Sequence, residues 1–213
     1  MARHVDHLVI PVPDLAATAA NFVGAGFVVT PAADHPFGTS NRLVVFVDTY
    51  LELVSVTSRE LVPPEGFAAE VSSFLETGAG VSHVVLSSDD ALDDHAVMAA
   101  RGLAVGEVFE FSRPAPRVDG STVTASFSIA RSVSTVPTGA FLCQHLVPDA
   151  VWHASHLAHP NGARRLREIM LRGPAPEVFE VFAVDGIRFD AAQTRILTDG
   201  DHEPFAVGDL AVG

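Results

Sequence analysis

Lysine is absent from this chain of 213 residues, and all 13 of its basic side chains are arginines. The absence excludes Schiff-base chemistry on a side-chain amine, including the usual attachment of pyridoxal phosphate. It also excludes a phosphate-binding loop of the GxxxxGK(S/T) type, because that loop depends on its lysine. Acidic residues outnumber basic ones, and the net charge of −13 disfavours nucleic-acid and membrane partners, since both present anionic surfaces that need basic patches.

Cysteine occurs once, as Cys143, so an internal disulfide is excluded and a reducing, cytoplasmic location is expected. No apolar run is long enough to span a membrane, and the first residues lead into a strand pattern without the core of a signal peptide. A GxSxG nucleophile elbow and a dinucleotide-binding GxGxxG are also missing. Cys143 shares a predicted strand face with His145, but an isolated buried cysteine is usually a small apolar residue rather than a nucleophile.

What the chain does contain is a repeated pattern, in which an apolar strand carries a histidine and leads through a turn into a helix. It occurs first around His7 and again around His83. Gly26 and Gly102, which end the two predicted helices, are separated by the same interval as the two histidines. Two features in one register without a gap indicate a duplicated module.

Each module continues with three more strand patterns, which gives the order β-α-β-β-β twice. The first module covers residues 1–60, with a helix at 15–23, and its later strands are predicted near 26–30, 42–47 and 49–56.

The second module covers residues 78–148 and follows a connector with a short helix at 63–77. Its helix is predicted at 89–101, and its later strands near 105–111, 122–130 and 141–146. Residues 149–213 are expected to form a loop and a degenerate C-terminal half-module. The predicted fold class is α+β, in one compact unit.

Glu52 interrupts the apolar pattern of the last strand of the first module. Alternation along a strand places Leu51 and Leu53 on one face, where they are suited to pack on the helix, and Glu52 on the other face with Tyr50 and Val54. A carboxylate on that inner face needs solvent, a partner or a metal ion.

The positions of His7, Glu52 and His83 resemble those of metal ligands in the vicinal oxygen chelate superfamily, and more narrowly in its glyoxalase-like branch. The closer similarity covers roughly residues 4–165 and is carried by four segments, at residues 6–15, 38–41, 50–53 and 159–163. The resemblance implies that the two modules pair into a cupped mixed sheet. It also implies one metal in the cup, held by side chains from strands one and four of each module.

His7, Glu52 and His83 would then supply three of the four metal ligands, and order and spacing put the fourth place near Gln144 or His145. Leu142 would share a face with the helix-packing leucines, which favours His145 as the inward residue. Gln144 is the alternative fourth ligand, because it is the better isostere of the glutamate usual in that place. Since that glutamate normally serves as the base, we expect no glutathione-dependent glyoxalase of the usual kind.

Imidazole and carboxylate ligands suit one divalent metal, although Zn, Fe, Ni, Co and Mn are not distinguished. His145 and Glu52 are the candidate catalytic residues, with His145 able to act as a base near neutral pH. The alternative interpretation is that His7 and His83 are hydrogen-bonded core histidines and that Glu52 lines a polar cavity without metal.

Two other groups of residues invite a functional interpretation. His153, His156 and His159 recur every third residue, but the following Pro160 and Asn161-Gly162 favour a loop over a metal-binding helix. Four arginines lie on or beside the predicted strands, and one that faced the cup would anchor a carboxylate or phosphate; these are Arg42, Arg113, Arg117 and Arg131.

The expected function is that of a metal-dependent lyase, isomerase or dioxygenase acting on a small oxygen-rich molecule. A metal-free protein of the same fold that binds or sequesters a small molecule is the alternative. The expected partner is a small-molecule substrate, without nucleic acid or membrane, and a homodimer is left open.

Overall fold

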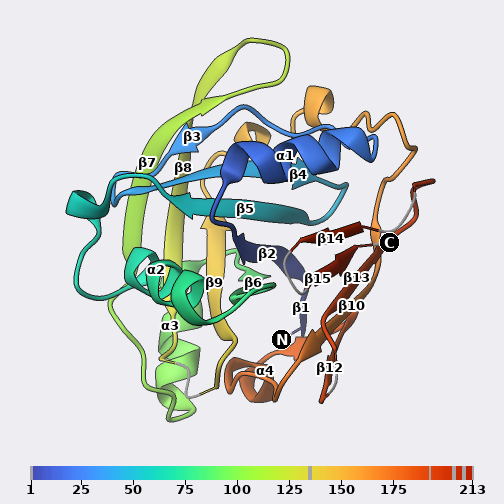
Figure 1. Cartoon of the computed structure of the whole chain (residues 1–213). Helices are drawn as coiled ribbons and strands as arrows, with labels where there is room; N and C mark the ends of the chain where they lie inside the picture. Colours follow the sequence, from blue (N-terminus) through green and yellow to red (C-terminus); the bar gives the residue numbers. More distant parts are fainter. Residues whose placement is uncertain (1, 134–135, 192, 203–204, 208–209, 213) are drawn as a thin grey trace.

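The computed structural model describes residues 2–133, 136–191, 193–202, 205–207 and 210–212. Its main feature is an eight-stranded mixed sheet, with a five-stranded sheet and a short strand pair beside it (Figure 1). The strand order in the large sheet is β3-β4-β5-β2-β6-β9-β8-β7. The sheet and its few helices confirm the predicted α+β fold.

The first module supplies one half of the large sheet. Its elements are β2 (Val5–Pro11), α1 (Leu15–Gly24), β3 (Ala33–Asp34), β4 (Thr39–Val45) and β5 (Tyr50–Val56). Asp14 begins α1 as predicted, because its side chain accepts a hydrogen bond from the backbone N–H of Ala17.

The second module supplies the other half and follows a 3₁₀ turn, η1 (Arg59–Leu61), and the connector helix α2 (Phe67–Thr77). Its elements are β6 (His83–Ser87), α3 (Ala91–Ala100), β7 (Phe109–Pro116), β8 (Thr122–Arg131) and β9 (Gly139–His145). Asp90 caps α3 by accepting from the backbone N–H groups of Leu92 and Asp93.

The two modules meet where β2 pairs with β6 in antiparallel orientation. His7 lies opposite Val85, and Val9 lies opposite His83. By the spacing of the repeat, His83 is the counterpart of His7, and Val85 is the counterpart of Val9. The two pairs are therefore equivalent, and a local two-fold axis passes between the strands. β5 then runs parallel to β2, and β9 runs parallel to β6. The duplication predicted from two histidines is therefore a relation in space.

Two predicted strands are displaced in the structure. The segment predicted as a strand at 26–30 is not one, because its backbone bonds elsewhere: the N–H of Val28 donates to the ring of His159. The short β3 at Ala33–Asp34 takes its place. The strand predicted at 105–111 begins only at Phe109 and extends to Pro116. Its two prolines are tolerated because β7 is an edge strand, where a missing N–H breaks no ladder.

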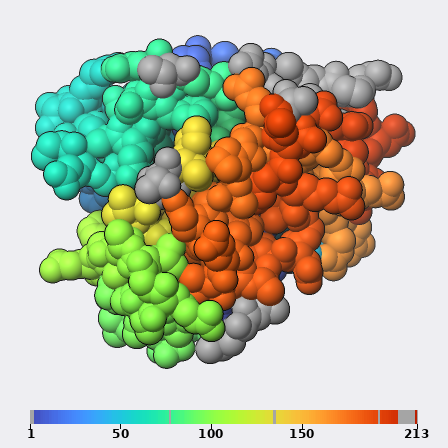
Figure 2. Space-filling view, turned by 90° about the horizontal axis from the view of Figure 1, so that it is seen from below, coloured from blue at the N-terminus to red at the C-terminus, as the bar shows by residue number. Residues whose placement is uncertain are grey.

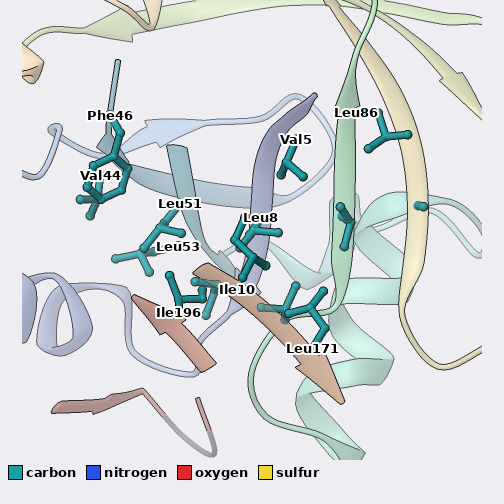
Figure 3. Close-up of a cluster of buried hydrophobic side chains, with 14 of the residues drawn as sticks. Val5, Leu8, Ile10, Val44, Phe46, Leu51, Leu53, Leu86, Leu171 and Ile196 are labelled. Carbon is teal, nitrogen blue, oxygen red and sulfur yellow. The ribbon is translucent and has the colours of Figure 1, made fainter. Parts of the chain in front are cut away.

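The outer face of the large sheet carries the main hydrophobic core. Leu51 and Leu53 point to this face, as predicted, and pack in one cluster with Phe22 of α1. Leu171 and Ile196 reach the same cluster from the smaller sheet (Figure 3).

That smaller sheet is built by the C-terminal residues, which lie against both modules in the view from below (Figure 2). Two 3₁₀ turns precede it, η2 (Pro148–Ala150) and η3 (Ala154–His156). Its strands are β10 (Leu166–Arg172), β12 (Ile187–Asp190), β13 (Arg195–Thr198), β14 (Phe205–Val207) and β15 (Leu210–Val212). Between β10 and β12 lie α4 (Val178–Val181) and β11 (Ala183–Val184), and β11 pairs with β1 (Ala2–Arg3). No helix in the described part of the chain is long and apolar enough to cross a membrane.

The inner face of the large sheet carries Glu52 and a second, smaller cluster that contains Val9, Tyr50 and Val54. The connector helix α2 packs on this face through Val71, which is fully buried. The inner face is therefore partly covered by α2 and otherwise curves around a cavity.

Candidate active site in the cup

A cavity of about 390 Å³ lies on the inner face of the large sheet, and we call it the cup. Its wall is mostly apolar, and the phenylalanines that line it are Phe37, Phe67, Phe109, Phe111, Phe127 and Phe141. Its polar lining includes His7 of β2, Asn41 of β4, Tyr50 and Glu52 of β5 and Arg113 of β7, together with His35 from the turn between β3 and β4. A mostly apolar pocket with a few convergent polar groups is typical of a small-molecule site.

The buried carboxylate of Glu52 is the centre of the polar group. One oxygen, Oε1, accepts a hydrogen bond of 2.7 Å from Nδ2 of Asn41. The other oxygen, Oε2, lies 3.7 Å from Nε2 of His7, and Oε1 lies at the same distance from Nε2 of His35. Asn41 therefore orients the carboxylate, while Oε2 stays available to a ligand.

Asp6 and His7 both reach this side of the sheet because the register of β2 shifts between Val5 and His7. Such a β-bulge interrupts the strict alternation of side chains. Oδ1 of Asp6 lies 2.6 Å from Nδ1 of His7 and 3.0 Å from Nε2 of His145. Burial by itself would raise the pKa of Asp6, but the imidazoles of His145 and His7 hold it well below its ordinary range.

An ionised carboxylate can only accept hydrogen bonds, so it holds the proton of His7 on Nδ1. In the neutral ring, the lone pair of Nε2 then faces the Glu52 carboxylate. This arrangement of carboxylate, histidine and open nitrogen is the one that orients metal-binding histidines in proteins.

His35 was not anticipated from the sequence, where it lies in a polar turn without periodicity. Its Nδ1 is 2.8 Å from Oγ1 of Thr39, and its Nε2 is 3.3 Å from Nδ2 of Asn41. Burial lowers the pKa of His35 to about 4, although the charge of Glu52 opposes this. His35 is therefore neutral near pH 7. Asp6, by contrast, had a signal in the sequence, because it is a charged residue beside a histidine in an apolar strand.

His83 makes its side-chain hydrogen bonds away from Glu52. Its Nε2 lies 2.8 Å from Oε2 of Glu70 in α2, and its Nδ1 lies 2.9 Å from Oγ of Ser82. The hydrogen bond from His83 and the charge of Arg131 lower the pKa of Glu70 to about 2, against a smaller opposing effect of burial. Gly139 makes room for this ring, because a Cβ at that position would lie 2.5 Å from Cδ2 of His83.

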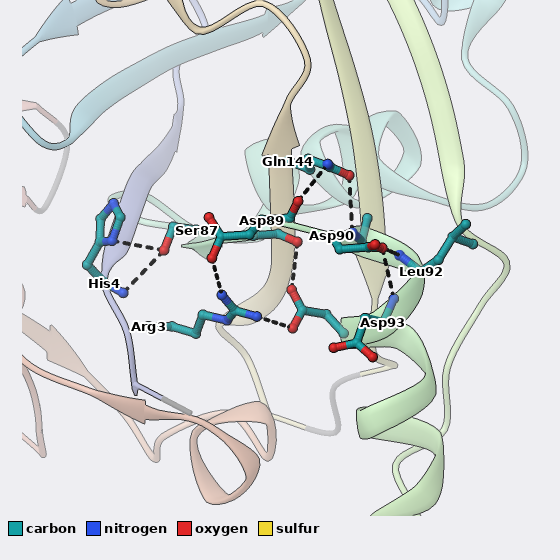
Figure 4. A network of polar contacts seen from close by, with 11 residues as sticks. Arg3, His4, Ser87, Asp89, Asp90, Leu92, Asp93 and Gln144 are labelled. Carbon is teal, nitrogen blue, oxygen red and sulfur yellow. Dashed lines mark hydrogen bonds and ion pairs between the residues drawn. The ribbon is translucent and has the colours of Figure 1, made fainter.

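Gln144 and His145 point to opposite sides of β9. The amide of Gln144 donates to the carbonyl oxygen of Asp89 at 2.7 Å and accepts from the N–H of Ala91 at 3.2 Å, at the start of α3 (Figure 4). The ring of His145 turns instead to Asp6 on the inner side. Gln144 thus hydrogen-bonds the backbone at the start of α3, and His145 belongs to the hydrogen-bond network behind His7.

The position in the second module that corresponds to Glu52 is Phe141, not Gln144 or His145. His7 pairs with Tyr50, two residues before Glu52, and the equivalent His83 pairs with Gly139, two residues before Phe141. The predicted alignment was displaced because it followed the apolar pattern of β9, whereas the pairing of β9 with β6 sets the register. A phenyl ring thus stands where a fourth ligand was expected.

The remaining candidates have structural partners. His159 accepts from the N–H of Val28 and bonds the carbonyl oxygen of Val45, and His156 bonds the carbonyl oxygen of Val151. Both histidines therefore tie loops together.

Cys143 is buried, and burial raises the pKa of its thiol, which suits the apolar role predicted for it. Of the four arginines, Arg113 and Arg131 line the cup. Arg42 donates to the carbonyl oxygen of Thr30, and Arg117 pairs with Asp149.

The resemblance to the vicinal oxygen chelate superfamily implies a divalent metal, and the side chains of His7 and Glu52 fit one. The 3.7 Å between Nε2 and Oε2 is too long for a hydrogen bond, but it is shorter than two metal–ligand bonds of about 2.1 Å each laid end to end. The donor set of nitrogen and carboxylate oxygen suits a transition metal. His83 and His145 are engaged with Glu70 and Asp6, so the four predicted ligands do not converge on one point in this structure.

Comparisons with known proteins agree with this geometry. Residues 5–183 match the family model described as a glyoxalase-like domain. A hypothetical protein from Staphylococcus aureus has a similar structure, with a TM-score of 0.72 and 11% sequence identity over 99% of both chains. Methylmalonyl-CoA epimerase in complex with methylmalonyl-CoA and NH4+ is similar with a TM-score of 0.50 and 19% identity, over 69% of this chain and 97% of the epimerase. None of the curated proteins matches the sequence. The chain belongs to the glyoxalase-like domain family.

Proposed function

We propose that this protein is an enzyme that acts on a small molecule in the cup through one divalent metal held by His7 and Glu52. The observation that supports the proposal is the pair of facing acceptor atoms, Nε2 of His7 and Oε2 of Glu52, 3.7 Å apart on a cavity wall. Two acceptors in that relation repel each other unless a cation or proton lies between them.

When bound there, the metal would polarise a substrate oxygen and lower the pKa of a coordinated water. The protein's own residues prepare the place for it. Asp6 fixes the tautomer and orientation of His7, and Asn41 holds the far oxygen of Glu52. His145 is not among the described residues that line the cup, and its Nε2 lies 3.0 Å from Asp6, so its role is to position the Asp6 carboxylate rather than to contact the substrate.

The aromatic wall has a consequence for chemistry in the cup. It removes water, which strengthens electrostatic interactions at the polar end. The groups at the polar end that could exchange protons with a substrate include Glu52 and the neutral His35. An isomerase, lyase or dioxygenase acting on a small oxygen-rich molecule fits these conditions, with Zn, Fe, Ni, Co or Mn as the metal.

A second function, metal-free binding of a small molecule, is favoured by a separate observation. Phe141 stands where the second module would supply a ligand, and Glu70 holds the ring of the other histidine, His83. Half of a two-module metal site is thereby replaced by an aromatic side chain and a hydrogen bond between Glu70 and His83. The presence of stoichiometric metal separates the two functions.

The test is elemental analysis of protein purified without chelator and again after reconstitution with each candidate metal. We expect the wild type to bind about one equivalent of metal. His7→Gln and Glu52→Gln should each lower the metal affinity at least tenfold, because each removes a ligand directly. His4→Gln is the matched control, because His4 is an exposed histidine just before the same strand. Less than about a tenth of an equivalent, with no uptake on reconstitution, would leave metal-free binding as the function.

A further inference from the structure

Arg113 is a buried cation that lines the cup. Only 5% of the surface of Arg113 is exposed to solvent. Within the described residues, the guanidinium makes one hydrogen bond to the protein, from Nη1 to the carbonyl oxygen of Pro114 at 3.3 Å. Its buried Nε has no hydrogen-bond partner among the same residues. No described carboxylate lies within ion-pair distance of it. A buried guanidinium in this state carries a desolvation cost that its protein contacts offset only in part.

Arg131, which lines the same cup, has the carboxylate partner that Arg113 lacks. Its Nη2 lies 2.5 Å from Oε2 of Glu70, and its charge is neutralised by that carboxylate. Both arginines lie over a phenylalanine ring, Arg113 over Phe127 and Arg131 over Phe141, each 5.8 Å from the ring centre, so the carboxylate partner is what distinguishes them. Glu52 is near enough to favour the charged form of Arg113, while burial acts more strongly and lowers the pKa of the guanidinium. The two arginines therefore offer an anion very different sites.

The wall around Arg113 is suited to a flat ring. Phe111 and Phe127 are stacked with their centres 5.0 Å apart, and Phe37 meets Phe111 edge-on at 5.4 Å. Phe141 also lines the cup, at the position that corresponds to Glu52. Aromatic side chains gather aromatic ligands through stacked and edge-on contacts.

We propose that the cup takes an aromatic carboxylate, with the carboxylate on Arg113 and the ring among the phenylalanines. A single guanidinium matches a single carboxylate through two parallel hydrogen bonds. A ligand with more than one negative charge would be repelled by the Glu52 carboxylate. No second unpaired cation among the described residues that line the cup would offset that repulsion. The proposal deepens the function given above and rests on the cup being its binding site, but it does not require the metal.

The experiment uses calorimetry on the full chain treated with chelator, with 1-naphthoate as the anionic probe and 1-naphthamide as its neutral isostere. We expect the wild-type protein to bind the carboxylate at least tenfold more tightly than the amide, because a charge-assisted pair is lost in the amide. Arg113→Gln should reduce that preference to less than about threefold while keeping its affinity for 1-naphthamide, which shows that the cup is intact.

Arg131→Gln is the matched control and should keep the preference, because Arg131 already has its partner. If Arg113→Gln fails to fold, Arg113→Lys retains a charge without the two parallel hydrogen bonds and should lose at least half of the preference. Equal affinity of the wild type for both probes, no binding of either probe, or loss of the preference in Arg131→Gln alone would overturn the proposal. Since the protein is metal-free in this experiment, its outcome is independent of the elemental analysis.

Discussion

Acidification should weaken the fold through His35, in a pH range that the structure defines. The buried ring bonds Thr39 through Nδ1, and its Nε2 lies toward Nδ2 of Asn41, which needs an unprotonated acceptor. Burial lowers its pKa from 6.5 to about 4, with Glu52 and Asp34 acting to raise it and Arg113 and His7 acting to lower it. The folded protein therefore keeps His35 neutral between these two pH values, whereas the unfolded chain takes up a proton.

The sign follows from this difference in bound protons. Where the unfolded state binds more protons, the free energy of unfolding falls as the pH falls. The contribution of His35 is fully present above its unfolded pKa of 6.5, declines toward its folded pKa of about 4, and changes no further below that. Between pH 7 and pH 4.5 the two pKa values correspond to a loss of about 2 kcal/mol.

The assay is urea unfolding of chelator-treated protein at pH 7 and pH 4.5, for the wild type, His35→Gln and His4→Gln. Titrating groups far from His35 contribute alike to all three proteins, so the difference between variants reports on His35 and the groups coupled to it. The loss on acidification should be smaller by about 2 kcal/mol in His35→Gln than in the wild type. His4 is exposed, so its variant should follow the wild type. Equal losses in the wild type and His35→Gln would refute the reasoning.

Three further predictions concern the second module. Gly139→Ala should destabilise the protein by about 1–3 kcal/mol in urea unfolding and displace the ring of His83, because the new Cβ would overlap it; Gly106→Ala, where a Cβ meets nothing within 4 Å, should change little. His145→Ala should weaken metal binding at least tenfold in a competition titration, whereas Gln144→Ala should leave it unchanged and shift only the unfolding midpoint; the reverse pattern would contradict the assigned orientations. The methylglyoxal–glutathione hemithioacetal should not be turned over at a rate on the order of 10 per second, since a phenylalanine stands at the place of the base, and turnover at that rate in a spectrophotometric assay would contradict the site described here.

Local patterns in the sequence determined which side chains of a strand share a face. Alternation in β5 separated Glu52 from Leu51 and Leu53, and the structure confirms that division between the inner and outer faces. The duplication inferred from His7 and His83 is likewise present in the pairing of β2 with β6. Both inferences succeed because the period of a strand and the spacing of a duplication are properties of the chain itself.

The composition of the site was decided by contacts between distant segments. The register of β9 against β6 made Phe141, rather than Gln144 or His145, the counterpart of Glu52. Nothing local in β9 sets that register, because it depends on the length and path of the chain that returns from β8.

Three residues of the site were brought there by tertiary packing alone. His35 arrives from a turn without periodicity, and Glu70 from a connector helix whose placement on the inner face follows from burying Val71. Arg113 was one of four equivalent arginines in the sequence, and only the antiparallel pairing of β7 with β8 turned it into the cup. Periodicity therefore determined the faces of the strands, while the register and packing between elements decided which polar groups meet across the cavity.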